Sequence, residues 1–317
     1  MKTVPPRIAI PMPHSTDREY GERAIPQYER AVELAGGEPV RIPLDQPSAE
    51  VAKLIARCDA VLLPGSKADI DPAKFHAPRS PHTAAADPRR DAVDALLLDD
   101  AYLRRKPVLG ICYGLQSLNV HRTGSLIQHI PDFLPEATRS KVNHEAGKKV
   151  AVAHAVEIER DSRLAEILCG DPGSATVPVG TGAPARPGRA ELGSAEGGGP
   201  RSEVRGPSAR AQLSDPGSAT VPVGTGAPAR PSRAQLGSAR QLILPVNSSH
   251  HQSADAIGDG LRIVARCPDD GIIEALEGTS PDHFVVAVQW HPERSVDEDE
   301  ASLAIFRALV EAARAAA

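Results

Sequence analysis

The chain has 317 residues, a formal net charge of −5 and no cluster of basic residues, which argues against nucleic acid or an anionic membrane as its partner. No apolar run reaches the roughly 18 residues of a transmembrane helix, and residues 1–14 lack the apolar core of a signal peptide. The four cysteines stand far apart without a C-x-x-C pair, so we expect reduced thiols in the cytoplasm.

The first part of the chain alternates between short apolar runs and amphipathic stretches. Strands are expected at residues 7–12, 38–42, 59–63 and 107–111. Helices are expected at residues 20–35, 49–57 and 88–105. Asp87-Pro88 supplies a capping residue and a proline at the start of the last helix. This alternation predicts an α/β fold with a mainly parallel sheet and helices on both of its faces.

The residues after this part return to similar patterns, with one long interruption. Strand-like runs cover residues 126–130, 150–158, 241–247, 261–267, 271–276 and 284–290. Helices are expected at residues 162–168 and 302–315. The runs at 261–267 and 271–276 are close enough in sequence to form a strand pair.

The interruption is a near-identical repeat. Residues 171–195 and 215–239 differ only at two positions, Gly188/Ser232 and Glu191/Gln235. The segment 171–239 has no aromatic residue, isoleucine or lysine, so it cannot bury enough apolar surface to offset its ordering entropy. Two copies are also fewer than the three or so that a solenoid needs. We therefore expect a disordered, duplicated insert at 171–239 within a single domain made of residues 1–170 and 240–317.

The most informative motif is Pro107-Val-Leu-Gly-Ile-Cys112-Tyr-Gly-Leu-Gln-Ser-Leu-Asn119. An apolar strand is followed by Gly110-Ile-Cys112-Tyr-Gly114, the G-x-C-x-G form of a nucleophile elbow, and then by a helical pattern. Such a sharp turn needs glycines on both sides, and it places the central side chain at the N-terminus of a helix, where a thiolate is favoured. A buried core cysteine is the alternative.

A second motif follows the apolar run at 284–290. His291 and Glu293 lie two positions apart, and Pro292 disfavours helix at the histidine, so both side chains point to one side of an extended chain. There a carboxylate can orient an imidazole as the base that a cysteine nucleophile requires. A solvated histidine and glutamate in a turn would be the ordinary alternative.

Together these motifs resemble the class I glutamine amidotransferases. The resemblance rests on the cysteine elbow, a Pro64-Gly65 turn after the preceding strand, and Gln289-Trp-His291-Pro-Glu293 before the last helix. Within that superfamily, Val246-Asn-Ser-Ser-His-His-Gln252 and Gly271-Ile-Ile-Glu-Ala-Leu-Glu277 resemble the γ-glutamyl-γ-aminobutyrate hydrolase branch, of the peptidase C26 type. The resemblance implies a flavodoxin-like three-layer fold.

The resemblance also implies roles for individual residues. Cys112 would be the nucleophile, His291 the general base and acid, and Glu293 the orienting carboxylate. The oxyanion hole would be formed by the backbone amides of Ser66 and Tyr113. Most relatives have Gly-Gly where this chain has Gly65-Ser66, and many members of the branch carry arginine in place of Tyr113.

Four residues are expected to contribute to substrate binding: Gly65, Gln116, His250 and His251. For each of the two histidines, a ring held by carbonyl groups at a strand end is an equal alternative. No metal is expected, since ligand spacing is missing from the conceivable set Cys112, His250, His251 and His291. The remaining histidines are expected to be structural or on the surface: His14, His76, His82, His129, His144, His154 and His283.

The reaction implied by the resemblance is hydrolysis of a γ-glutamyl amide through a γ-glutamyl thioester, with no cofactor. The expected partner is a small γ-glutamyl compound, and the sequence does not decide whether the chain forms a homodimer. One alternative is a glutaminase subunit that delivers ammonia to a partner synthetase. Another is a catalytically weak γ-glutamyl-binding sensor, which the departures at Ser66 and Tyr113 keep open.

Overall fold

The computed structural model describes residues 4–170 and 241–316, except for the side chain of Lys148. The predicted insert at 171–239 lies outside the described residues. The strands are β1 (Arg7–Pro11), β2 (Glu38–Ile42), β3 (Ala60–Leu63), β4 (Val108–Ile111), β5 (Leu126–Ile127), β6 (His154–Glu159), β7 (Gln241–Val246), β8 (Ser253–Ala254), β9 (Leu261–Arg266), β10 (Ile273–Gly278) and β11 (Val285–Val288). The α-helices are α1 (Arg18–Leu34), α2 (Ser48–Ile55), α3 (Pro88–Arg104), α4 (Tyr113–His121), α5 (Ile130–Phe133), α6 (Glu136–Arg139), α7 (Arg163–Cys169) and α9 (Glu300–Ala316). Short 3-10 helices cover Pro72–Phe75, Ala146–Lys148 and Pro292–Arg294.

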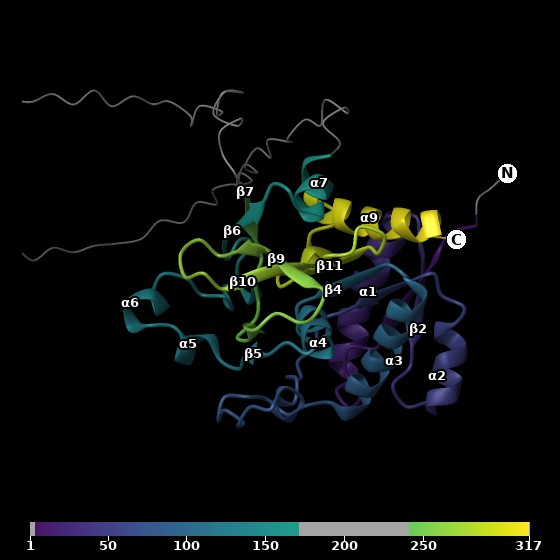
Figure 1. The fold of residues 1–317 in the computed structure, drawn as a ribbon, viewed down its shortest axis with the longest axis horizontal. Coiled ribbons are helices and arrows are strands. Elements are labelled where there is room, and N and C mark those ends of the chain that lie inside the picture. The colour runs from purple at the N-terminus through teal and green to yellow at the C-terminus, as the bar shows by residue number, and fades with distance from the viewer. Residues whose placement is uncertain (1–3, 171–240, 317) are drawn as a thin grey trace, which may run out of the picture. The chain divides into compact units, whose positions relative to one another are not determined.

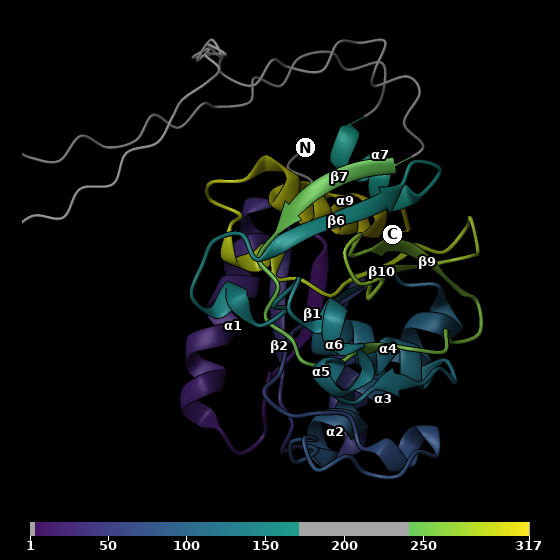
Figure 2. The ribbon, with the colours of Figure 1, turned by 90° about the vertical axis from the view of Figure 1, so that its left-hand side faces the viewer.

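One large sheet organises these elements, in the order β2-β1-β3-β4-β11-β10-β9-β6-β7 (Figure 1). The strands from β2 to β11 pair in parallel, as the βα alternation predicts. From β11 outward the pairing is antiparallel, and β6 and β7 run side by side at the far edge (Figure 2). The predicted strand pair is the hairpin of β9 and β10. The chain is therefore of the predicted α/β class.

Side-chain alternation along the strands divides the core between the two faces of the sheet. Ile8 and Ile10 of β1 pack in one buried cluster with residues of α1, α7 and α9, whereas Ala9 packs in another with residues of α2, α3 and α4. Strands buried on both faces read as continuous apolar runs, which is why β3 and β4 are apolar at nearly every position. The predicted helices on both faces are therefore present.

Element ends follow local signals in most places. Asp87 accepts hydrogen bonds from the amides of Arg89 and Arg90 at 3.2 Å and so caps α3, as predicted. The strand expected at 126–130 is wrong beyond Ile127, because Ile130 begins the short helix α5. The strand expected at 150–158 starts only at His154, where pairing with β7 begins.

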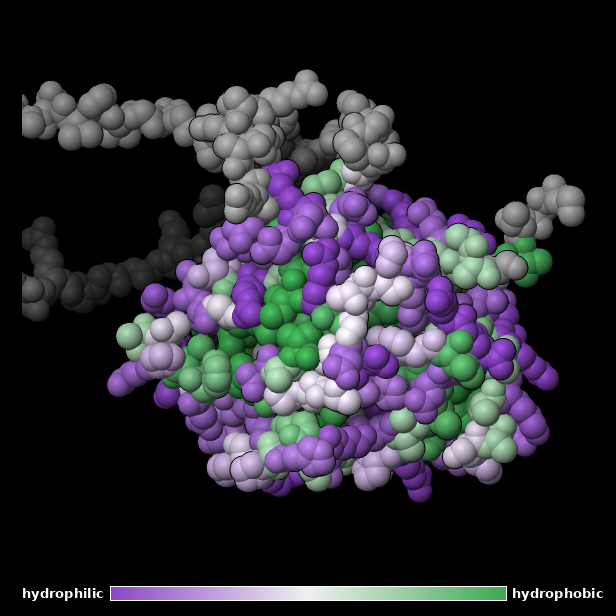
Figure 3. Space-filling view, viewed as in Figure 1, coloured by the Kyte–Doolittle hydropathy of each residue, from purple (hydrophilic) through white to green (hydrophobic). Residues whose placement is uncertain are grey.

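The surface is mixed in character. On the face in Figure 3, hydrophilic residues surround an apolar area near the middle. A few large apolar side chains are exposed in the described part of the chain: Val4, Leu103, Phe133, Val150, Val152 and Ile243. Among the described helices, none has both the length and the apolar character needed to cross a membrane.

Candidate active site

Three neighbouring strand ends bring together the two motifs that were predicted to be catalytic. In the parallel part of the sheet, β4 lies between β3 and β11, with Gly110 opposite Leu63 and Ile111 opposite Val288. The segments that follow these strands therefore emerge at the same carboxyl edge, where parallel α/β sheets usually place their sites. These segments begin with the Pro64-Gly65 turn, with Cys112 and with Gln289-Trp-His291.

The elbow has the strained geometry expected from its glycines. Cys112 has φ +53° and ψ −105°, a conformation that non-glycine residues rarely adopt, and it forms the N-cap of α4. A Cβ atom on Gly114 would lie 2.2 Å from the carbonyl oxygen of Leu63. One on Gly110 would lie 2.9 Å from the backbone of Gly114. The close approach of helix, turn and neighbouring strand thus requires glycine on both sides of the cysteine.

His291 and Glu293 form a buried pair. Nδ1 of His291 and Oε1 of Glu293 are 2.7 Å apart. The predicted extended conformation is wrong at Glu293, because the chain turns into the 3-10 helix Pro292–Arg294 directly after His291. Burial alone would lower the pKa of His291, but the charge of Glu293 and the charge and hydrogen bond of Cys112 outweigh it and raise this pKa to about 9. The pKa of Glu293 is lowered in turn: its burial acts to raise it, and His291 outweighs that effect.

Gly65 marks the point where the predicted nucleophile and base meet. A Cβ atom placed on Gly65 would lie 3.1 Å from Cε1 of His291 and 3.7 Å from Cβ of Cys112. It would also lie 3.1 Å from the hydroxyl oxygen of Tyr28. Cysteine, histidine and the glycine turn therefore surround one small space, and a side chain at position 65 would fill it.

The backbone amides near Gly65 differ in whether they are hydrogen-bonded within the protein. The amide of Gly65 donates a 3.0 Å hydrogen bond to the hydroxyl of Tyr28, on α1. In the described part of the chain, no hydrogen bond is seen from the amides of Ser66 and Tyr113. Tyr113 opens α4, where a helix leaves its first amides unpaired. The two amides predicted for the oxyanion hole therefore belong to the turn after β3 and to the residue directly after Cys112.

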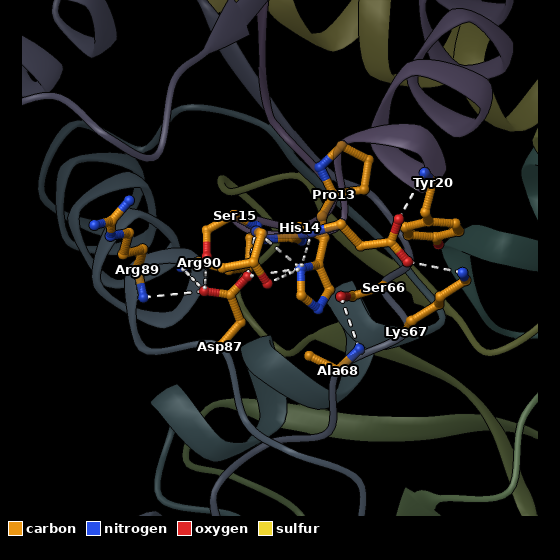
Figure 4. A network of polar contacts seen from close by, with 12 residues as sticks. Pro13, His14, Ser15, Tyr20, Ser66, Lys67, Ala68, Asp87, Arg89 and Arg90 are labelled. Atoms are coloured by element: carbon orange, nitrogen blue, oxygen red, sulfur yellow. Dashed lines mark hydrogen bonds and ion pairs between the residues drawn. The ribbon is translucent and has the colours of Figure 1, made fainter.

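Two polar contacts stabilise the turn that carries Ser66 (Figure 4). The hydroxyl of Ser66 accepts a 3.1 Å hydrogen bond from the amide of Ala68, and Lys67 forms a 2.8 Å ion pair with Asp17. Asp17 itself caps α1 by accepting from the amide of Tyr20. The serine that replaces the usual glycine is therefore accommodated, with its side chain bonded back to its own loop.

Asn247 is a residue whose individual role the sequence did not reveal. Its side-chain oxygen accepts from the amide of His291 at 2.9 Å, and its side-chain nitrogen donates to the carbonyl of His291, also at 2.9 Å. These two bonds fix the backbone of His291, the predicted base, to the loop after β7. The sequence held one signal for this role, namely the position of Asn247 in the motif Val246–Gln252. The side chain of asparagine can both donate and accept a hydrogen bond, whereas an aspartate side chain can only accept.

The side chains of Gln116 and Tyr113 are both buried. Nε2 of Gln116 donates to the carbonyl of Gln252 and to the side chain of Gln289, each at 3.3 Å. The hydroxyl of Tyr113 donates to Asp91 on α3 at 2.6 Å, and its ring packs in a buried cluster with Ala68 and Ile70. The ring of Tyr113 is therefore directed towards α3, and only its backbone amide is left for the predicted oxyanion hole.

The two neighbouring histidines point to different surroundings. Nδ1 of His250 lies 2.8 Å from the carbonyl of Gln252, while its Nε2 lies 3.4 Å from Glu274. Nε2 of His251 lies 3.1 Å from Asp69, and its Nδ1 lies 3.3 Å from His129. Both nitrogens of the buried His250 ring thus face protein groups, and that ring braces the loop instead of standing free beside Cys112.

Comparison with known proteins gives consistent results. The sequence profile of the peptidase C26 family matches residues 8–178 and 227–293. A relative from Mycobacterium tuberculosis, named provisionally as a glutamine amidotransferase, is 32% identical over 90% of this chain and 66% of its own length. This chain therefore spans slightly less than two thirds of that relative. The γ-glutamyl-γ-aminobutyrate hydrolase of Escherichia coli K12 is 25% identical over 90% of this chain and 84% of its own.

A solved structure shows the likeness of fold. It is a protein from Thermoplasma acidophilum that is named provisionally as part of a GMP synthase, with a TM-score of 0.51 and 13% identity. The alignment covers 99% of this chain and 96% of that one. At this identity the likeness concerns the fold alone.

Proposed function

The chain belongs to the peptidase C26 family of class I glutamine amidotransferase-like proteins, and we propose that it hydrolyses a γ-glutamyl amide and releases glutamate. The observation that carries the proposal is the meeting of Cys112 and His291 around Gly65, with Glu293 bonded to the far side of the imidazole. An activated cysteine nucleophile needs these parts: a thiol, a base beside it and a group that orients the base.

In the proposed mechanism, His291 accepts the thiol proton and the sulfur of Cys112 attacks the γ-carbonyl carbon. The negative charge that develops on the carbonyl oxygen is met by the amides of Ser66 and Tyr113. His291 then gives its proton to the leaving amine as the C–N bond breaks, which leaves a γ-glutamyl thioester. A water molecule, deprotonated by His291, attacks the thioester, and glutamate leaves as the thiol is restored. No cofactor enters these steps.

We propose γ-glutamyl-γ-aminobutyrate or a related γ-glutamyl amine as the substrate. Support comes from the Val246–Gln252 motif and from the relative of that name. In such a substrate the amine carries a tail, and binding of the tail helps to orient the scissile bond, so a truncated substrate loses rate as well as affinity. The preference over glutamine is expected to be at least about tenfold in kcat/KM, or roughly 1.4 kcal/mol.

A second candidate is a glutaminase that supplies ammonia to a partner. It is favoured by the provisional amidotransferase name of the M. tuberculosis relative. Comparing kcat/KM for γ-glutamyl-γ-aminobutyrate, other γ-glutamyl amines and glutamine, with the protein alone, separates the two. Hydrolysis of glutamine only, or activity that requires an added protein, would contradict the hydrolase proposal. Binding of γ-glutamyl compounds without any turnover would instead support a sensor.

A further inference from the structure

A second group of reactive side chains lies in the antiparallel part of the sheet. It consists of three histidines and one glutamate, all buried, whose nearest donor atoms lie within 4.8 Å of one another: His144, His154, His250 and Glu274. We refer to these four residues as the His–Glu cluster. Its members come from four places, namely the segment between α6 and β6, the start of β6, the loop after β7, and β10. None of them is a catalytic residue of the proposed hydrolysis, and among them only His250 was also predicted to contribute to substrate binding.

The outward nitrogen of each ring is already bonded. Nδ1 of His154 lies 2.9 Å from the carbonyl of Ala155, and Nδ1 of His250 lies 2.8 Å from the carbonyl of Gln252. Because a carbonyl oxygen only accepts, each Nδ1 must carry the proton. In a neutral ring the inward Nε2 then presents a lone pair. This tautomer is the one that a metal-binding histidine adopts when a second group fixes its orientation.

His144 has the same arrangement with its nitrogens exchanged. Its Nε2 lies 2.7 Å from Oδ2 of Asp270, while its Nδ1 faces the cluster. A carboxylate behind a ligating imidazole is a common partner in metal sites, since it orients the ring and strengthens it as a ligand. Every histidine of the cluster therefore has a supporting acceptor on its outer side.

The inner side of the cluster lacks proper hydrogen bonds. Oε1 of Glu274 lies 3.1 Å from Nδ1 of His144 and 3.4 Å from Nε2 of both His154 and His250. These inward nitrogens and both oxygens of Glu274 are buried without a hydrogen bond of normal geometry. Lone pairs of two neutral rings thus face a buried carboxylate, an arrangement that costs free energy unless a cation lies between them.

The distances suit a metal ion of a particular kind. Bonds of about 2.0–2.1 Å in a tetrahedral zinc site place neighbouring ligand atoms about 3.3 Å apart. The three distances from Oε1 of Glu274 to the ring nitrogens, 3.1–3.4 Å, agree with that spacing, and all four donor atoms lie within 4.8 Å of one another. Imidazole and carboxylate ligands suit Zn²⁺ and its neighbours among divalent transition metals. We propose that the His–Glu cluster binds one such ion, with Zn²⁺ the best match.

The proposed role of the ion is structural. All four ligands come from the protein and are buried, as in closed structural sites, which keep no open position for a substrate. His144 and His154 precede the segment 171–240 in the chain, whereas His250 and Glu274 follow it. The ion would therefore link parts of the domain from both sides of that segment. It would also fix the loop that carries Asn247, which holds His291.

The test uses full-length protein and Zn²⁺ or Co²⁺ alone as probes. Metal content measured by mass spectrometry after addition of Zn²⁺ and gel filtration should be about one ion per chain, and Zn²⁺ should raise Tm. Co²⁺ should give the visible absorption of a tetrahedral site without a thiolate charge-transfer band. This measurement needs no variant, so it remains decisive if a substitution prevents folding.

Variants locate the ion. His154→Gln and Glu274→Gln should weaken Zn²⁺ binding at least tenfold and remove its effect on Tm. A matched control is His129→Gln, in the more exposed group of His82, His129 and Asp132, whose donor atoms also lie within 4.8 Å of one another. Cys112→Ala is a second control, for binding at the proposed nucleophile. Both controls should bind Zn²⁺ like the unmodified chain.

Three outcomes would overturn the proposal. One is a protein that takes up no stoichiometric Zn²⁺ or Co²⁺. In that case a proton on His144 would supply the positive charge that the cluster needs. Burial acts to lower the pKa of His144, but the hydrogen bonds and charges of Asp270 and Glu274 raise it to about 9. The second is binding that survives both cluster substitutions. The third is a cobalt–thiolate band, or binding lost in Cys112→Ala. None of these readouts depends on hydrolytic activity, so the proposed function is tested separately.

Discussion

The two proposed sites lie in different halves of the large sheet, and their residues are distributed differently along the chain. In the parallel half, Cys112 and the His291–Glu293 pair follow adjacent strands, and each motif is contained in a few consecutive residues. In the antiparallel half, the His–Glu cluster gathers single residues from four segments. The first site is therefore largely defined by local backbone geometry at strand ends, whereas the second depends on strand pairing across a long interruption of the chain.

This difference suggests how the halves respond to change. Removal of a group in the parallel half should affect chemistry and leave the fold intact, because the elbow is supported by backbone packing of Gly110 and Gly114. Removal of a group that joins the halves, such as Asn247, should affect the placement of the base. The predictions below run from the largest expected effect to the smallest.

The largest effect is expected for Cys112→Ala. Loss of the nucleophile should lower kcat/KM for γ-glutamyl amides by at least about 10⁴-fold while Tm barely changes, since little packing is lost. A glutamine-like diazo-ketone should label the unmodified chain once, at Cys112, as seen by peptide mass mapping. Labelling of Cys58, Cys169 or Cys267 with Cys112 untouched would refute the proposed mechanism.

Glu293→Gln should come next, with a loss of about 10²-fold or more in kcat, because the charge that orients and stabilises the His291 imidazolium is removed. The raised pKa of His291 contributes stability that is complete below its ordinary value of 6.5 and is lost as pH rises through about 9. The lowered pKa of Glu293 contributes stability above its ordinary value of 4.5, and this is lost as pH falls below it.

The difference in Tm between the unmodified chain and Glu293→Gln should therefore be greatest between about pH 4.5 and 6.5 and should shrink towards pH 9. Thermal melts at several pH values measure it. Glu298→Gln, a nearby surface carboxylate, is the matched control. A difference that stays constant from pH 5 to 9 would show that the two groups are not electrostatically coupled.

A smaller effect is expected for Asn247→Ala. Both hydrogen bonds to the backbone of His291 are lost, and a base displaced by a fraction of an ångström should cost about tenfold in kcat with little change in KM. Asn247→Asp keeps only the acceptor for the amide of His291, so its kcat should lie between that of the unmodified chain and that of Asn247→Ala. Equal kcat for all three proteins would exclude a positioning role for Asn247.

The smallest effect is expected from deletion of residues 171–239, whose disorder remains a prediction. Joining Gly170 to Arg240 through a short flexible linker should leave kcat/KM and Tm almost unchanged, because loop closure costs only about 0.6 kcal/mol per doubling of length. Limited proteolysis of the intact chain should cleave there first. A deletion variant that unfolds, or protection of the segment from protease, would identify it as part of the structured domain.

Much of the fold was accessible from the sequence because its signals are local. Apolar runs marked β3, β4 and β11, and Asp87-Pro88 marked the start of α3. Ile130 was misassigned because a five-residue segment with apolar residues at 126, 127 and 130 fits either a strand or the start of a short helix. The proposed roles of His250 and Gln116 in substrate binding stay untested, and their observed partners, Glu274 and Gln289, lie far away in the sequence.

By itself the sequence determined the α/β class and the elbow at Cys112, because strand periodicity and turn geometry act over a few residues. Only the tertiary structure decided that Asn247 holds His291, that the ring of Tyr113 turns away into α3, and that His144 and His154 meet Glu274. Such contacts depend on the register and order of distant strands. Those are set by packing of the whole core, and no local spacing in the chain records them.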